Sequence, residues 1–171
     1  MDLSSKKVVM VIAPENFRDE EYFHTKESIE KKGAIVDTAS LQKTAISGIE
    51  KKEVEVDLLL NDIGDEYDAI VFVGGGGAKI YFQNEKAQQL ARKYYDDGKV
   101  VAAICIAPLI LAHAGILKDK KATVWDGSHS DLIDFGANYT AKDVEADGNI
   151  ITANGPRASY KFGKMIAKAL K

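Results

Sequence analysis

Short runs of apolar, β-branched residues alternate along this chain with longer amphipathic segments. The runs predict buried strands, and the apolar residues that recur every three to four positions between them predict helices. Strands that alternate with helices of this length favour a parallel sheet with helices packed on both faces, which is an α/β three-layer sandwich. The strands are expected at residues 8–13, 34–39, 69–73 and 100–104, and the helices at 17–32, 85–96, 106–114 and 156–170.

The remaining segments predict smaller elements around this sheet. Residues 44–57 are polar with alternating valines and indicate a small hairpin, and residues 122–125 indicate a short strand. Asp147-Gly148 separates two short apolar runs, 144–146 and 149–152, which is a strong hairpin signal. The chain has 171 residues, so we expect one domain over residues 1–171.

The composition excludes several classes of protein. The formal net charge is −3, from 23 basic and 26 acidic residues, whereas a nucleic-acid-binding protein normally carries a basic face. The sequence has no apolar run near the roughly 18 to 20 residues that span a bilayer and no secretory signal, so a soluble cytoplasmic protein without membrane or nucleic-acid partners is expected. A single cysteine cannot form an internal disulfide.

That single cysteine, Cys105, stands where an apolar strand is expected to run directly into a helix. A side chain at such a turn projects above the end of the sheet, beside the free N–H groups of the helix, as nucleophiles do in α/β hydrolases. Small residues at 103 and 107 allow a tight elbow. The alternative is a buried, inert thiol, but the elbow favours a nucleophile whose thiolate form the helix N-terminus stabilises.

Four glycines follow the third expected strand, beginning with Gly74, Gly75 and Gly76. The run lacks the residues of a phosphate-binding loop and the spacing of a dinucleotide fingerprint, so an oxyanion hole is the better interpretation. The N–H groups of Gly75 and Ile106 would supply its two donors. A flexible turn is the alternative.

Two adjacent acids, Glu20 and Glu21, lie early in the first expected helix. Acids in a first turn favour the helix dipole, so they can act as caps. One of them can instead face Cys105 across the strand ends. A carboxylate repels a thiolate, so one member of such a pair must hold a proton, which makes the carboxyl group a general acid or base.

The aromatic and imidazole side chains are weaker candidates. His113 lies about 12 Å along the helix axis from the cysteine, too far to serve it, and His24 is expected on the surface. His129 lies in a loop near the strand ends, where it can enter a substrate pocket or remain structural. Trp125 is either an apolar wall of that pocket or part of the core.

Several segments together resemble the DJ-1/PfpI superfamily, over nearly the whole chain and in the right order. They are Ala102-Ala103-Ile104-Cys105-Ile106-Ala107-Pro108, the Gly74-Gly75 pair, Phe17-Arg18-Asp19-Glu20-Glu21 and Asn154-Gly155-Pro156-Arg157-Ala158-Ser159. The resemblance implies a flavodoxin-like fold of the class I glutamine amidotransferase type. It implies a homodimer, or a hexamer as in the protease-like branch, with no metal or organic cofactor.

The resemblance also implies roles for particular residues. Cys105 matches the reactive cysteine, Gly75 the glycine on the oxyanion side, and Glu21 the acid that bonds the cysteine, with Glu20 as the alternative if the register differs by one. Protease-like members carry His directly after the nucleophile, where this chain has Ile106. Members of the DJ-1 branch of the superfamily tend to have His at the position of Trp125 or Asp126 in this chain.

Three functions follow from this pattern of retained and missing residues. An enzyme that acts on small dicarbonyls or their adducts, as a glyoxalase III or deglycase does, needs only the cysteine and the acid, and is favoured. A cysteine peptidase or amidase is the second hypothesis, weakened by Ile106. A redox sensor or stress chaperone is the third, because a cysteine of this kind is suited to forming a sulfinic acid.

Overall fold

A seven-stranded sheet forms the centre of the protein, as seen in the computed structural model, which describes residues 2–171. Its strand order is β11-β12-β8-β7-β1-β3-β6, and every neighbouring pair is parallel except β11 and β12, which are antiparallel. The strands are β1 Lys7–Val11, β3 Ile35–Ser40, β6 Leu58–Leu59, β7 Ala69–Phe72, β8 Val100–Ile104, β11 Val144–Asp147 and β12 Ile150–Ala153.

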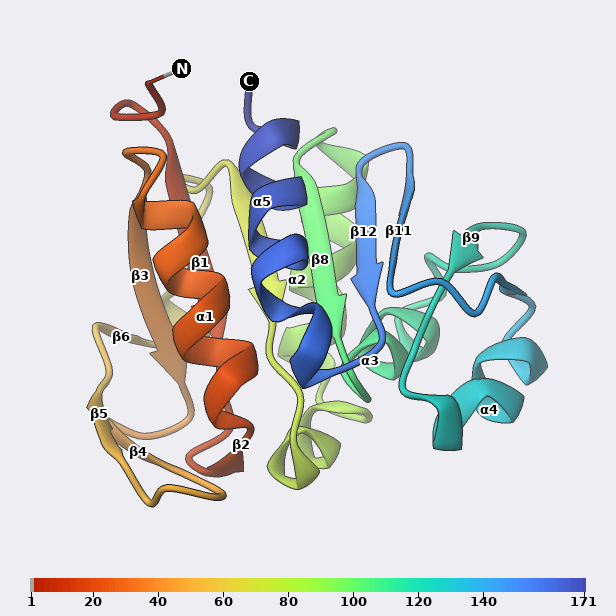
Figure 1. Ribbon diagram of the computed structural model, residues 1–171, viewed down its shortest axis with the longest axis horizontal. Helices are drawn as coiled ribbons and strands as arrows, with labels where there is room; N and C mark the ends of the chain where they lie inside the picture. Colours follow the sequence, from red (N-terminus) through yellow and green to blue (C-terminus); the bar gives the residue numbers. More distant parts are fainter. Residues whose placement is uncertain (1) are drawn as a thin grey trace.

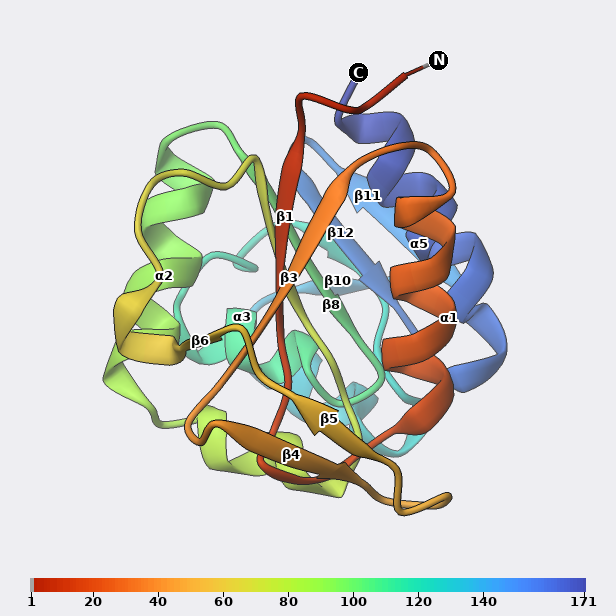
Figure 2. The same cartoon turned by 90° about the vertical axis from the view of Figure 1, so that its left-hand side faces the viewer.

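Helices cover both faces of this sheet (Figure 1). Figure 2 shows α1 and α5 on one face and α2 and α3 on the other. Their bounds are α1 Asp19–Glu30, α2 Glu85–Asp96, α3 Pro108–His113 and α5 Ser159–Ala169. The flavodoxin-like, mostly parallel sandwich that the sequence predicts is therefore confirmed.

The alternation of side chains along each strand divides the core into two parts. In β1, Val8 and Met10 pack under α1 and α5, whereas Val9 and Val11 pack under α2 and α3. All four side chains are fully buried, as is expected of a central strand in a parallel sheet. The described part of the chain begins and ends at the end of the sheet opposite to the carboxyl ends of the parallel strands (Figure 1).

The helix expected over 17–32 is shorter, because its first residues form a different element. Residues Glu15–Phe17 are a strand, β2, and α1 begins at Asp19. The N–H of Arg18 donates to the carbonyl of Gly74, 3.0 Å away. This bond holds the chain extended beside the glycine run and brings the start of α1 next to the end of β7.

The strand expected at 122–125 is wrong over most of its length. Only Lys121–Ala122, strand β9, pairs with another strand, β10, at Asn138–Tyr139. The N–H of Thr123 donates to the side chain of Thr152, and that of Trp125 donates to the carbonyl of Cys105. These donors are therefore not available for a ladder, and the segment crosses the strand ends instead.

The two hairpins predicted from the sequence are present in the structure, whereas several short helices in the structure were not predicted. The hairpin expected within 44–57 consists of β4, Thr44–Ser47, and β5, Glu53–Glu55, and β2 joins β4 in the same sheet. The expected hairpin at Asp147-Gly148 is β11 and β12. Short helices at Leu60–Asp62, Gly76–Tyr81, Asp126–Ser128, His129–Asp134 (α4) and Pro156–Ala158 were not expected as separate elements. Within residues 2–171, every helix is too short or too polar to cross a bilayer.

Candidate active site

Cys105 occupies a sharp turn between β8 and α3. Its φ is +65°, in the left-handed region that non-glycine residues rarely adopt. The backbone on both sides is tied down, because its N–H donates to Ala153 and its carbonyl accepts from Trp125, at 2.9 and 2.8 Å. Ile106 and Ala107 form a turn, so α3 begins at Pro108 rather than at 106 as expected. The elbow predicted from the sequence is present, in a conformation that is typical of functional sites.

Gly74 leaves the space in which the cysteine meets an acid. A Cβ atom placed on Gly74 would lie 2.5 Å from Oε1 of Glu21 and 2.7 Å from Cβ of Cys105. Both contacts are shorter than van der Waals distance, so a side chain here would push the two residues apart. Gly74 thus lies beneath the two side chains and does not line the open pocket.

Gly75 is required for a different reason, namely its backbone conformation. Its φ is +97°, and a Cβ atom there would lie 2.5 Å from the N atom of Arg18. In this conformation the N–H of Gly75 faces the sulfur of Cys105, as does the N–H of Ile106. These are the two donors expected from the sequence, and they lower the pKa of the thiol.

Glu21 is a completely buried acid in the first turn of α1. Neither of its carboxyl oxygens completes a hydrogen bond with any group in residues 2–171, although the Cys105 thiol and the Gly74 N–H lie beside it. Burial therefore raises the pKa of Glu21 to about 8, despite the opposing effects of the thiol and of Arg18. Glu21 holds its proton at neutral pH.

The cysteine and the acid titrate as a pair. Burial, followed by the charge of an ionised Glu21 and a hydrogen bond to it, raises the pKa of Cys105 to about 12, which outweighs the two backbone N–H groups. The two N–H groups act in the expected direction, but burial and Glu21 outweigh them, so the thiolate expected from the sequence is not the favoured form of Cys105 at neutral pH. Because each negative charge opposes the other, the pair carries at most one of them near neutral pH.

Glu20 has a separate role from Glu21. Its Oε2 accepts from Nε of Arg18 at 2.8 Å, and both side chains are more than one third exposed. The pKa of Glu20 is accordingly lowered, chiefly by that hydrogen bond. Of the two adjacent acids, the structure places only Glu21 at the cysteine.

A pocket of about 340 Å³ opens above Cys105. Of the residues expected from the sequence, its wall contains Glu21, Gly75, Gly76, Cys105, Ile106 and Trp125. Trp125 is half exposed and stands at the rim, so it is not part of the core.

His129 does not reach the pocket. Its Nδ1 bonds the carbonyl of Asp126 at 2.6 Å, and its ring stacks on Tyr139. His129 is the first residue of the short helix α4, and these two contacts give its ring a structural role. No histidine of residues 2–171 lines the Cys105 pocket.

Three residues of this pocket were not singled out in the sequence: Arg18, Lys79 and Pro156. Arg18 and Pro156 belong to segments that carried the family resemblance, which was the available signal. Lys79 lies in the short helical turn that follows the glycines, and nothing in its local pattern distinguishes it from a surface lysine. In the described part of the chain no three His, Cys, Asp or Glu side chains converge as a metal site.

Comparison with known proteins places this geometry in a family. The model of the DJ-1/PfpI family matches residues 6–169. The chain is 34% identical to deglycase PfpI of Pyrococcus furiosus over 95% of this chain and 99% of that protein, and 41% identical to protein MJ0967 of Methanocaldococcus jannaschii over 99% and 85%. The crystal structure of a ThiJ/PfpI domain protein from Brachyspira murdochii superposes with a TM-score of 0.93 at 33% identity, covering 96% of this chain and 95% of that one. The fold, the elbow cysteine and these matches agree, and the chain belongs to the DJ-1/PfpI family.

Proposed function

We propose that this protein is a cysteine-dependent enzyme that acts on small reactive dicarbonyls or on their adducts. The observation that carries the proposal is the pairing of the partly exposed Cys105 with a fully buried, protonated Glu21. Among residues 2–171, no histidine lines the pocket above this pair. Relatives named deglycase support a DJ-1/PfpI-type activity in general. Among the activities of this family, the pair of Cys105 and Glu21 favours a reaction for which a thiol and a carboxyl group suffice.

The reaction begins when the sulfur of Cys105 attacks the aldehyde carbon of a dicarbonyl such as methylglyoxal. The pair reacts in the form that carries one negative charge, with the charge on sulfur and the proton on Glu21. A carbon–sulfur bond forms and the carbonyl electrons move to the oxygen, which the Gly75 and Ile106 N–H groups face. Glu21 gives its proton to that oxygen, which yields a hemithioacetal and leaves Glu21 as a carboxylate. In an adduct of the dicarbonyl with an amine, the same carbon carries a hydroxyl group and the amine nitrogen. The sulfur attacks this carbon, the carbon–nitrogen bond breaks, and the amine leaves with the proton of Glu21, so that the same hemithioacetal forms.

Glu21 then moves a proton between the two carbons. Its carboxylate removes the proton on the carbon that carries sulfur, and its carboxyl group returns it to the neighbouring carbon. The hydroxyl proton of the first carbon passes to the oxygen of the second, so that a thioester of the 2-hydroxy acid forms. Water hydrolyses the thioester and restores the thiol. Methylglyoxal and one water thus give lactic acid with no oxidant or reductant. A pKa near 8 suits an acid that must both accept and donate this proton.

A peptidase reaction has less support here. In the protease-like pattern, a histidine next to the cysteine protonates the leaving nitrogen of the amide. Ile106 stands at that position, and the other pocket residues provide no imidazole.

The test is lactate formation from methylglyoxal by the purified protein. We expect Cys105→Ala to abolish it and Glu21→Gln to reduce it by about two to four orders of magnitude, the usual contribution of general acid–base catalysis. Glu20→Gln, which removes the neighbouring acid that faces Arg18, should retain most of the activity. Lactate formation that is equal in the wild type and Cys105→Ala would refute the proposal.

A further inference from the structure

A second hollow adjoins the Cys105 pocket and has no part in the reaction described so far. Its volume is about 720 Å³, about twice that of the Cys105 pocket, and the two share Arg18, Trp125 and Pro156 as walls. We call it the α1–α5 groove, because His24 of α1 and Tyr160 of α5 form its far side. A three-carbon dicarbonyl fits within the Cys105 pocket alone, so the groove has room for a larger part of a substrate.

The groove contains one cation that has no partner. The chain has only three arginines, and two of them, Arg18 and Arg157, line this groove. Arg18 is bound to Glu20, whereas Arg157 makes no hydrogen bond or ion pair with any of residues 2–171. A guanidinium group matches the two oxygens of a carboxylate, and it remains charged at all relevant pH values.

The other charges of the groove favour a carboxylate over a phosphate. The walls also contain two acids, Glu20 and Asp126. Glu20 is paired with Arg18, but Asp126 is almost fully exposed and faces solvent. A doubly charged phosphate would meet this repulsion more strongly than a singly charged carboxylate does.

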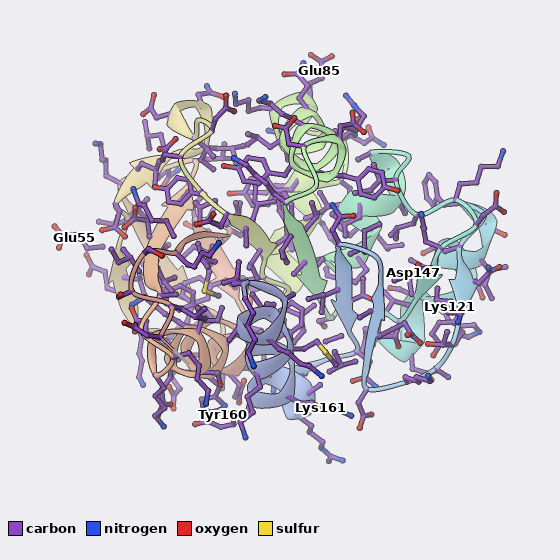
Figure 3. The ribbon with its side chains drawn as sticks, turned by 90° about the horizontal axis from the view of Figure 1, so that it is seen from above. Glu55, Glu85, Lys121, Asp147, Tyr160 and Lys161 are labelled. Atoms are coloured by element: carbon purple, nitrogen blue, oxygen red, sulfur yellow. The ribbon has the colours of Figure 1, made fainter. Side chains whose placement is uncertain are left out.

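Aromatic side chains provide flat walls for the carbon skeleton of a ligand. The rings of His24 and Tyr160 are stacked, with their centroids 4.3 Å apart and their planes at 11° to each other. This contact joins α1 to α5 beside the groove. Tyr160 projects from the outer side of α5, next to Lys161, which does not line the groove (Figure 3). On the opposite side, the backbone of Trp125 is fixed by its hydrogen bond to Cys105, so the groove begins directly at the nucleophile.

We propose that the α1–α5 groove binds the amine-bearing part of a dicarbonyl adduct, and that Arg157 holds the carboxylate of that part. The inference rests on the proposed function, and it names the substrate class as adducts of amino acids or of peptide carboxyl termini. When the sulfur displaces the amine from the adduct, the amino acid leaves through the groove and the three-carbon fragment stays on Cys105.

Binding can be measured without any turnover. Trp125 is the only tryptophan in the chain and lies at the junction of the two hollows, so its fluorescence reports ligands in the groove. The probes are Nα-acetyl-lysine, which has a free carboxylate, and its methylamide, which has none, titrated into the Cys105→Ala protein. We expect the carboxylate probe to bind about fivefold more tightly, a moderate preference because Arg157 is exposed.

Arg157→Gln in the same background should remove this preference, whereas Lys161→Gln, a neighbouring exposed cation on α5, should leave it unchanged. Equal affinity for the two probes, or a preference that survives Arg157→Gln, would overturn the proposal. Displacement of Nα-acetyl-lysine by inorganic phosphate at equal concentration would overturn the assignment of a carboxylate.

A kinetic experiment separates this inference from the proposed function. The methylglyoxal adducts of both probes are given to the enzyme with its cysteine intact, and lactate and released amine are measured. If neither adduct nor free methylglyoxal yields lactate, the proposed function is wrong, and the fluorescence result still decides the groove. If both adducts react with equal kcat/KM, the dicarbonyl chemistry stands and the role of Arg157 is wrong.

Discussion

Replacing Glu21 by Gln is expected to change how the stability of the protein depends on pH. The folded protein raises the pKa of this acid from its ordinary value of 4.5 to about 8, because the side chain is buried. Between these two values the folded state holds a proton that the unfolded state releases. Stability is therefore highest below about pH 4.5 as far as this residue is concerned, and it falls as the pH rises through 8.

The size of the effect follows from the same two pKa values. Their difference corresponds to about 5 kcal/mol in total, of which about 4 kcal/mol is lost between about pH 5 and pH 8.5. Glutamine has nearly the same shape but cannot ionise, so the Glu21→Gln protein should not show this loss of stability between the two pH values. The assay is urea unfolding at the two pH values, with the free energy of unfolding obtained by linear extrapolation.

Glu20→Gln is the matched control, since it removes the adjacent acid. The pKa of Glu20 is lowered by its hydrogen bond to Arg18, so this acid is ionised in both states throughout the same pH range. The control should therefore keep the wild-type loss of stability. If wild type and Glu21→Gln lose equal free energy between the two pH values, the assignment of a protonated, buried Glu21 is wrong.

Three further substitutions have expected outcomes that urea unfolding can measure. Gly74→Ala should lower the free energy of unfolding by about 1 to 3 kcal/mol, because its methyl group would contact Glu21 and Cys105 below van der Waals distance; an unchanged value would contradict that packing. Cys105→Gly should be more stable than Cys105→Ala by up to about 1 kcal/mol, since glycine adopts a φ of +65° without strain, and equal stability of the two would argue against a strained elbow. Asn84→Ala should lose about 1 kcal/mol, because the Asn84 side chain caps α2 by accepting from the N–H of Ala87.

Periodicity in the sequence predicts the central sheet well because its strands are buried on both faces. The runs at 69–73 and 100–104 are continuous and apolar, and each forms a central strand within one residue of the expected bounds. The run at 122–125 has a similar composition, yet most of it forms no ladder. Its backbone donors bind Thr152 and Cys105, which are distant in sequence, and no local pattern reveals such bonds.

The candidate site shows the same division between local and long-range information. The elbow at Cys105 can be predicted because a strand, a small residue on each side and a helix follow one another directly in the chain. The choice between Glu20 and Glu21 cannot, since both are acids in the same turn and only the packing of α1 against the strand ends buries one of them. Arg157 and Trp125 are distant in sequence and line the same groove only in the folded protein, so sequence patterns do not predict the groove.

Two energetically unfavourable features coincide at the centre of this site. A non-glycine residue at positive φ and a buried carboxyl group without a completed hydrogen bond each destabilise the folded state. Together they place a sulfur nucleophile and a proton of intermediate acidity beside two backbone N–H donors. The protease-like pattern has an imidazole at position 106, where this chain has isoleucine, which supplies neither an acid nor a base. The proposed function needs no further group, since it consists of addition to an already reactive carbonyl carbon followed by the movement of a proton between carbons.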